Sequence, residues 1–385
     1  MRRVKRLVVL TEIISPYRIP VFNALAKVGG IDLHVIFLAE TDPAIRDWLV
    51  YKNEIRFSYE VLPSYRKRFG GVNILVNRGV SRTLRSSACD VVICGGYNYV
   101  ASWEALAWAR RNHVPFLLWT ESTARDSRRH NRLIETLKRN FIGRCDGFVV
   151  PGESSSRYLT HFQISTDRIF TAPNAVDNDL FKRAADAVRM KASEWRSQMG
   201  LPKRFFLFVG RIVAEKGVFD LLNAYGGLRP DLRREVGLVF VGDGPARAEL
   251  ERRAGDVAAC SVRFTGFVHR ESLTGYYALA DALILPTHTD TWGLTVNEGM
   301  ACGLPIVCTD VAGCAPDLVK DGWNGHVIPP FDTRRLAQVL EEFSSCPDTL
   351  RAMGERSLSR ILGYSPEACA NGMAQAALSM QTKYD

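Results

Sequence analysis

Short apolar runs alternate with segments of helical periodicity along the whole chain. Apolar runs of this length, separated by helices, are typical of parallel sheets that are covered by helices on both faces. The alternation occurs once in each half of the chain, so it predicts an α/β fold with two Rossmann-like α/β/α domains. The strand-like runs are residues 6–14, 34–38, 91–94, 116–119 and 147–150, then 205–210, 237–242, 262–266, 282–286 and 305–308. Helix-like segments of the first half lie near residues 20–28, 72–87, 99–112, 127–143 and 153–161.

A polar stretch without strand pattern, between Asp177 and Trp195, separates the two sets. We therefore predict one domain over residues 1–180 and a second over residues 181–365. Residues 366–385 are rich in alanine and are expected to form a terminal helix that returns to the first domain. Ligands of such folds bind where strand carboxyl ends and helix amino ends converge, so we expect a site in a central cleft that the two domains face.

The composition is that of an ordinary globular protein, with 46% hydrophobic and 24% charged residues. The nine cysteines include no Cys-x-x-Cys pair, and the spacing of Cys302, Cys308 and Cys314 does not match a zinc site. Buried thiols in a reducing compartment are therefore predicted. The basic and apolar start resembles a signal peptide, but Glu12 interrupts it and we interpret it as a buried strand. No run reaches the roughly 18–20 apolar residues of a membrane span, so a cytoplasmic protein is expected.

The formal charge of +9 lies entirely in the first half. Residues 1–180 hold 26 Lys and Arg against 17 Asp and Glu, whereas residues 181–385 hold 24 of each sign. A basic nucleic-acid binder would not divide its charge in this way, so no nucleic-acid partner is expected. The asymmetry favours an anionic membrane or a lipid-linked acceptor, with a peripheral location at the inner face of the plasma membrane.

Two segments carry much of this basic charge. Residues 125–144 mix Arg and Lys with apolar residues at helical spacing, and residues 65–69 combine basic with aromatic residues. A basic amphipathic helix can lie on anionic lipid. For the helix, the alternative that its apolar face packs on its own sheet is favoured.

Two glycine-containing turns follow strands of the second half. One strand ends at Gly210, and Arg211 and Lys216 follow it beside a helix start. Two cations next to free helix N–H groups can bind a diphosphate, and a solvated surface loop is the equally weighted alternative. The other turn covers residues 241–250 and resembles a Gly-x-Gly-x-x-Gly nucleotide-binding turn, but Arg247 stands in place of the third glycine. On its own, this turn is therefore weak evidence for nucleotide binding.

The strongest motif covers residues 282–325. A buried strand ends at Pro286, a polar loop carries Asp290, and Gly293 precedes a helix that contains Glu298. Gly293 allows a ligand to approach the backbone, and N–H groups at a helix start favour phosphate oxygens. The two carboxylates can accept hydrogen bonds from hydroxyls of one ligand. The alternative is that these acidic residues lie near the start of the helix only because negative charge there interacts favourably with the helix dipole.

In this order and spacing, the segments resemble the retaining glycosyltransferases of family 4 (glycosyl transferases group 1), which have the GT-B fold. The matching pieces are Gly210-Arg211, Glu215-Lys216-Gly217, residues 242–245, residues 264–268, Glu298-Gly299-Met300-Ala301, Gly303, Pro305 and Asn324-Gly325. The resemblance implies an acceptor-binding first domain and a donor-binding second domain. It implies that a hexose-type sugar moves from a UDP- or GDP-sugar to a saccharide or lipid-linked acceptor, in polysaccharide or glycolipid biosynthesis.

The resemblance also implies roles for single residues. Arg211 and Lys216 would hold the diphosphate and Asp290 would face the donor sugar, and these three are the catalytic candidates. Glu298 would accept hydrogen bonds from the ribose hydroxyls. The other donor-binding candidates are Gly210, Phe267, Val268, Trp292, Gly293, Leu294 and Thr295.

Departures from the family pattern concern both domains. Asp290 stands where the family has Glu, so its reach toward the sugar is one methylene shorter. Residues 14–20 replace a glycine-rich loop, and Tyr17 and Arg18 become candidates at the cleft edge, where Arg18 could supply charge. Glu121 occupies a strand end where many relatives have His, and helix capping is its alternative role.

The implied mechanism retains anomeric configuration and needs no metal, no other cofactor and no dedicated nucleophile. Asp177 and Asp179 have the spacing of a metal-binding pair, but we interpret them as part of the interdomain linker. Two other functions remain open: a sugar-nucleotide epimerase with the same fold, and a nucleotide-sugar-binding protein without activity.

Overall fold

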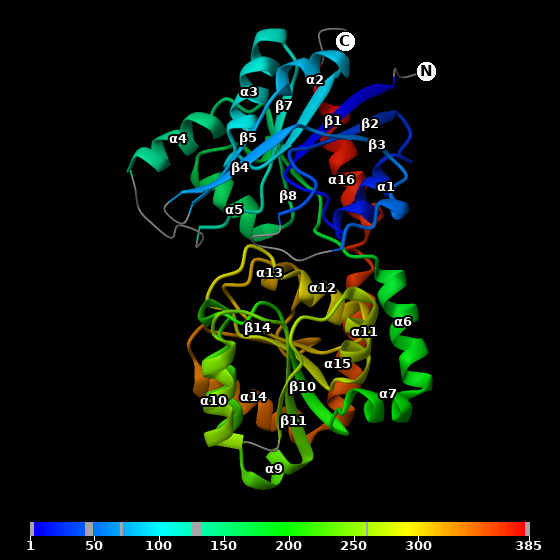
Figure 1. Cartoon of the computed structure of the whole chain (residues 1–385), viewed down its shortest axis with the longest axis vertical. Coiled ribbons are helices and arrows are strands. Elements are labelled where there is room, and N and C mark those ends of the chain that lie inside the picture. The colour runs from blue at the N-terminus through cyan, green and yellow to red at the C-terminus, as the bar shows by residue number, and fades with distance from the viewer. Residues whose placement is uncertain (1–3, 43–48, 70–71, 125–131, 259–260, 382–385) are drawn as a thin grey trace. The chain divides into compact units, whose positions relative to one another are not determined.

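A computed structural model describes residues 4–42, 49–69, 72–124, 132–258 and 261–381 (Figure 1). It divides the chain into two compact units. The first consists of residues 1–176 and 365–385, and the second of residues 177–364. Each unit is built around its own parallel sheet.

The first unit has a seven-stranded sheet in the order β3-β2-β1-β6-β7-β8-β9, in which all the pairs are parallel. Its strands are β1 (Lys5–Thr11), β2 (Ile31–Phe37), β3 (Ser58–Val61), β6 (Val91–Gly95), β7 (Phe116–Trp119), β8 (Gly147–Val150) and β9 (Ile169–Thr171). Its helices are α1 (Arg18–Leu25), α2 (Val80–Ser86), α3 (Val100–Asn112), α4 (Arg132–Ile142), α5 (Glu153–His161) and α16 (Pro366–Ser379), with short 3-10 turns at Lys52–Glu54 and Thr166–Arg168.

Strand β1 has a hydrophobic core on each of its faces. Val8 and Leu10 face the core that includes α3 and the end of α4, whereas Leu7 and Val9 face the core formed with α1 and α16. All four side chains are at most 1% exposed. Burial on both faces explains why the strand is a continuous apolar run rather than an alternating one.

The second unit has a six-stranded sheet in the order β12-β11-β10-β13-β14-β15, again with parallel pairs. Its strands are β10 (Arg204–Val209), β11 (Val236–Val241), β12 (Val262–Phe264), β13 (Ala282–Leu285), β14 (Ile306–Thr309) and β15 (Gly325–Ile328). Its helices are α6 (Asn178–Met190), α7 (Ala192–Met199), α8 (Val218–Gly226), α9 (Pro230–Glu235), α10 (Arg247–Ala258), α11 (Arg270–Leu279), α12 (Leu294–Ala301), α13 (Ala315–Leu318), α14 (Thr333–Ser345) and α15 (Pro347–Ile361), with a 3-10 turn at Ala214–Lys216.

The predicted fold class, two Rossmann-like α/β domains, is confirmed. One predicted element is wrong: the helix expected over residues 72–87 is an antiparallel hairpin of β4 (Ser64–Phe69) and β5 (Val72–Asn77), followed by the short α2. In β5 the side chains alternate between exposed Ile74 and Val76 and buried Leu75 and Asn77. That alternation is a strand pattern, and it overrides the helical interpretation.

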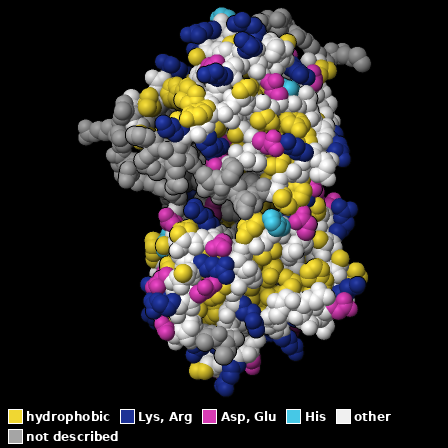
Figure 2. All heavy atoms as spheres, viewed as in Figure 1, with side chains coloured by type: hydrophobic (Ala, Val, Ile, Leu, Met, Phe, Trp, Pro, Cys, Tyr) yellow, Lys and Arg dark blue, Asp and Glu magenta, His cyan; other side chains and the backbone are white. Residues whose placement is uncertain are grey.

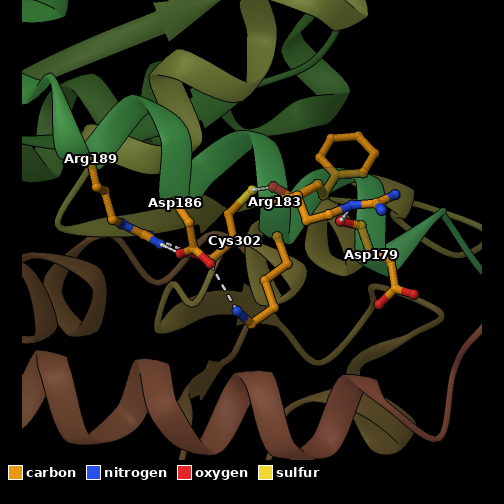
Figure 3. Close-up of polar contacts among 7 residues, drawn as sticks. Asp179, Arg183, Asp186, Arg189 and Cys302 are labelled. Atoms are coloured by element: carbon orange, nitrogen blue, oxygen red, sulfur yellow. Dashed lines mark hydrogen bonds and ion pairs between the residues drawn. The ribbon is translucent and has the colours of Figure 1, made fainter.

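The polar stretch after residue 177 is helical, and it begins at a capped residue. The Asp177 carboxylate accepts a hydrogen bond from the Leu180 amide at 2.9 Å, so Asp177 is the N-cap of α6. Asp179 lies seven residues before Asp186, about two turns along α6, and Figure 3 shows its carboxylate directed away from Asp186. The two aspartates therefore serve the start of a helix.

Helix α6 is anchored to the second unit by Arg189 (Figure 3). Its guanidinium donates to the carbonyl oxygens of Ala278, at 3.1 Å, and Cys302, and it pairs with Asp186. Lys182 donates a hydrogen bond to Asp186 at 2.8 Å and lowers the pKa of that carboxyl. These contacts place α6 in the second unit, which begins four residues before the predicted boundary.

Candidate functional site

The predicted donor residues gather at the carboxyl edge of the second sheet. Strand β10 ends at Val209 and leads through Gly210 and Arg211 to the 3-10 turn that carries Lys216. Strand β13, which neighbours β10, ends at Leu285 and leads through Asp290 to α12. Because both strands end at the same edge, residues distant in sequence meet there.

Lys216 and Asp290 form an ion pair at this edge. The Lys216 Nζ atom donates to Asp290 Oδ2 at 2.5 Å, and the two side chains are 25% and 17% exposed. The other carboxylate oxygen accepts the Trp292 amide at 3.3 Å. An ammonium has three N–H donors, and in the part of the chain that the structure describes only Asp290 takes one from Lys216, so two remain for a further anionic ligand. Asp290 thus orients Lys216 without using up its hydrogen-bonding capacity.

The turn that carries Lys216 packs tightly on the loop after β13. Gly217 has φ +67°, a left-handed conformation that favours glycine. A Cβ atom there would lie 2.7 Å from the carbonyl carbon of Pro286 and closer still to its oxygen. The Glu215 carbonyl accepts hydrogen bonds from the His288 amide at 2.8 Å and from the Thr287 hydroxyl at 3.1 Å. The position of Lys216 is therefore fixed by its backbone neighbours.

His288 adds a second link between the two segments, one that the sequence analysis missed. Its Nε2 atom lies 2.5 Å from Asp220 Oδ2, in the first turn of α8. The Phe331 ring packs on the imidazole with a centroid distance of 3.8 Å. Phe331 is 68% exposed, and its φ of +64° is rare for a bulky residue and strains the backbone.

The amino end of α12 presents two backbone donors. Gly293 is its N-cap with φ +98°, and no side chain caps the helix. Within the described part of the chain, no protein acceptor receives the amides of Leu294 and Thr295. Unpaired N–H groups at a helix start attract anions.

Glu298 and Trp292 are buried behind this helix start. Glu298 is 1% exposed, and its Oε2 atom accepts a hydrogen bond from the Tyr277 hydroxyl at 2.5 Å. The Trp292 indole, 2% exposed, donates to Asn297 Oδ1 at 2.8 Å. Tyr277 and Asn297 carried no signal in the sequence, because nothing local indicates which partner a buried polar group will meet.

The remaining donor-side candidates lie at the carboxyl ends of β10, β11 and β12. The Gly210 amide donates to the Val241 carbonyl at 3.0 Å. Gly242 pairs with Gly266, directly before Phe267 and Val268. Phe267 is 47% exposed and Arg211 is also exposed. An exposed aromatic ring and a cation are thus present at this edge.

The first unit has its own polar cluster at strand carboxyl ends. The Arg18 guanidinium pairs with Glu121, donates to Asn174 Oδ1 at 2.9 Å and stacks 4.1 Å above the Trp119 ring. Arg18 is 17% exposed and Glu121 is 31% exposed. Tyr17 precedes it as the N-cap of α1. The Glu121 carboxylate therefore balances the charge of the Arg18 guanidinium. The alternative role predicted for Glu121, helix capping, involves residues 125–131, which lie outside the described residues.

Cysteines and carboxylates in the described residues form no metal site. No group of three or more His, Cys, Asp or Glu side chains there is placed to hold an ion. Burial raises the pKa of the Cys308 thiol to about 12 and that of Cys302 further. That the reaction needs no metal stays a prediction.

The fold is that of a GT-B glycosyltransferase. Two family models match the chain: Glycosyltransferase Family 4 over residues 22–180 and Glycosyl transferases group 1 over residues 191–360. The chain belongs to this glycosyltransferase family.

Curated relatives and solved structures agree with this assignment. The chain is 35% identical over 182 residues to an alpha-D-kanosaminyltransferase of Streptomyces kanamyceticus, covering 47% of this chain and 46% of the relative. It is 27% identical to the O-antigen chain mannosyltransferase C of Escherichia coli, over a match that covers 60% of this chain and 59% of the relative. The matched region spans about half the length of these relatives.

Among solved structures, the match to HepE of Anabaena in complex with UDP covers 97% of this chain and 100% of the HepE chain. It has a TM-score of 0.77 and 17% identity. The lipopolysaccharide outer core galactosyltransferase WaaB covers 97% and 99%, with a TM-score of 0.70 and 16% identity. At these identities the likeness establishes the fold.

Proposed function

We propose that the protein transfers a hexose-type sugar from a UDP- or GDP-sugar to a saccharide or lipid-linked acceptor, with retention of configuration, in polysaccharide or glycolipid biosynthesis. The observation that carries the proposal is the Lys216–Asp290 pair beside the uncapped start of α12. It places one ammonium and two free backbone amides at a single sheet edge. The HepE structures with UDP and with UDP-glucose support a nucleotide-sugar donor.

Charge development on the leaving group explains why this arrangement suits glycosyl transfer. The bond between the anomeric carbon and the diphosphate oxygen breaks, and both electrons stay on the diphosphate. Lys216, Arg211 and the amides of Leu294 and Thr295 are donors for that growing negative charge. Donors already in place stabilise the transition state without reorganisation. Removing one such donor costs about 10²–10³ in rate.

The other candidates act on the rest of the donor. Glu298 holds the ribose hydroxyls, with Tyr277 fixing its carboxylate, and Phe267 packs on the nucleobase. Asp290 both orients Lys216 and faces the sugar, because each carboxylate oxygen can accept a second hydrogen bond.

The acceptor binds at the Arg18–Glu121 cluster of the first unit. One Glu121 oxygen pairs with Arg18, and its other oxygen, which has no donor among the described residues, would accept the acceptor hydroxyl. The hydroxyl attacks the anomeric carbon from the face that the diphosphate leaves, and its proton passes to a diphosphate oxygen. Atoms and charge balance without a metal or an enzyme nucleophile.

The test is a panel of UDP- and GDP-sugars, each incubated with the protein and with saccharide or lipid-linked acceptors. We expect one donor to release nucleoside diphosphate in an acceptor-dependent way, and the product to keep the anomeric configuration of that donor by NMR. An epimerase would instead convert the donor alone. Nucleotide-sugar binding without release for any acceptor would contradict transfer.

A further inference from the structure

The apolar stripe of α4 is buried at one end of the helix and exposed at the other. Ile134, Leu137 and Phe141 follow the spacing of one helix face. Phe141 is fully buried in the core with α3, whereas Ile134 and Leu137 are 46% and 48% exposed. The sequence analysis favoured an apolar face that packs on its own sheet. The structure shows this for the last turn only, and in the first unit α4 extends beyond the helices it packs on (Figure 1).

The outer face of the β4–β5 hairpin is apolar too. Tyr65 pairs with Val76, and Lys67 pairs with Ile74. The three apolar members of these pairs are 67%, 41% and 44% exposed in the order Tyr65, Val76 and Ile74, whereas Leu75 on the opposite face is 3% exposed. In an ordinary sheet the solvent face is polar, so this face is one that lacks a partner.

The hairpin and α4 belong to one layer of the first unit, because Leu75 and Phe141 contribute to the same core. Figure 2 shows hydrophobic side chains gathered over the β4–β5 hairpin, with Lys and Arg side chains around them. Residues 64–78 and 132–144 hold eight Lys and Arg against a single acid, Glu135. Glu135 pairs with Lys138, and Arg66 pairs with Asp42 from outside the two segments.

We propose that these two segments, the outer face of β4–β5 and the exposed half of α4, form a docking surface for an anionic lipid bilayer. Half-exposed apolar side chains within a cationic surround match the boundary between lipid headgroups and acyl chains. Among the described residues, no helix is long and apolar enough to cross a bilayer. The inference deepens the proposed function, because it names where a lipid-linked acceptor is met.

The experiment is flotation of the full chain with vesicles of phosphatidylcholine mixed with phosphatidylglycerol, and with phosphatidylcholine alone. We expect binding to the anionic vesicles that weakens at high NaCl. Ile134→Gln with Leu137→Gln, and separately Ile74→Thr with Val76→Thr, should lower the partition coefficient about tenfold. Lys67→Gln should lower it about fivefold, the usual effect of one cation near such a surface.

A matched control is Met190→Gln with Leu362→Gln, which removes two apolar side chains of the second unit that are 83% and 70% exposed. This control should bind vesicles like the wild type. Circular dichroism melting checks that all variants fold. The proposal is overturned if the wild type does not float, if the α4 and hairpin variants float as well as it does, or if those variants instead dissolve a dimer seen by light scattering.

Nucleoside diphosphate release with a water-soluble acceptor separates this inference from the proposed function. The docking variants should keep that rate, because the substituted residues belong to the first unit, whereas Lys216, Asp290 and the start of α12 belong to the second. Vesicle binding with no release from any donor would refute the proposed activity and leave the docking surface standing.

Discussion

Gly217→Ala tests the claim that the turn after β10 holds Lys216 in position. The substitution leaves every charged group of the site intact. It adds a single methyl group to a residue with φ +67°, directed at the carbonyl of Pro286. Any loss of activity therefore comes from geometry rather than from missing chemistry.

The expected effect has two parts. A left-handed conformation costs a non-glycine residue about 1–2 kcal/mol, and forcing an atom into a packed site costs about 1–3 kcal/mol more. To relieve the contact with the Pro286 carbonyl, the turn has to move by about 1 Å, a displacement that can cost about 10²-fold in rate. We expect lower stability of the second unit together with a hundredfold lower kcat.

The assay measures nucleoside diphosphate release and thermal unfolding in parallel. The matched control is Gly255→Ala in α10, where a Cβ atom meets nothing within 4 Å. That control should keep full activity and gain up to about 1 kcal/mol, because alanine is the better helix former. Wild-type kcat in Gly217→Ala would refute the reasoning, since the position of Lys216 would then not depend on this packing.

Three further predictions concern packing, the donor and the thiols. Asp177→Ala removes the N-cap of α6 and should lower the free energy of unfolding by about 1 kcal/mol without changing kcat; an unchanged denaturation midpoint would argue against the cap. Tyr277→Phe removes one hydrogen bond from the Glu298 carboxylate and so weakens its positioning; the KM for the donor should rise more than kcat falls, and an unchanged KM would contradict the ribose role. In a Cys260→Ser background at mildly alkaline pH, one thiol should react quickly with a thiol reagent. This is exposed Cys346. Burial raises the pKa of six of the other described thiols, so these form the reactive thiolate only at much higher pH, and Cys89 is buried away from the reagent; several fast thiols would be the opposite result.

The alternation of apolar runs was enough to predict both sheets, because strands buried on both faces leave a strong local pattern. The hairpin at residues 64–77 was missed since its alternating exposure occurs in a short segment that ends in a true helix, α2. Pairing between distant residues left no local signal at all. Lys216 and Asp290 are 74 residues apart, and Arg18 and Glu121 are 103 apart.

Motif positions were still sufficient to select residues that meet at the carboxyl edge of the second sheet, and their role in donor binding stays a prediction. Lys216, Asp290 and the start of α12 were chosen for their chemistry, and parallel strand order brings them together. Their supporting partners were not predictable in this way. His288, Asp220 and Tyr277 act through side-chain contacts that depend on how α8 and α11 pack, which is a property of the folded unit.

The most direct measurement is the rate of nucleoside diphosphate release by Lys216→Ala at saturating donor and acceptor. Lys191→Ala serves as its control, because Lys191 is an exposed lysine of the same unit. If Lys216 stabilises the departing diphosphate, kcat should fall about 10²–10³-fold while the protein stays folded, and the control should match the wild type. A Lys216→Ala protein that turns over at the wild-type rate would contradict the central claim.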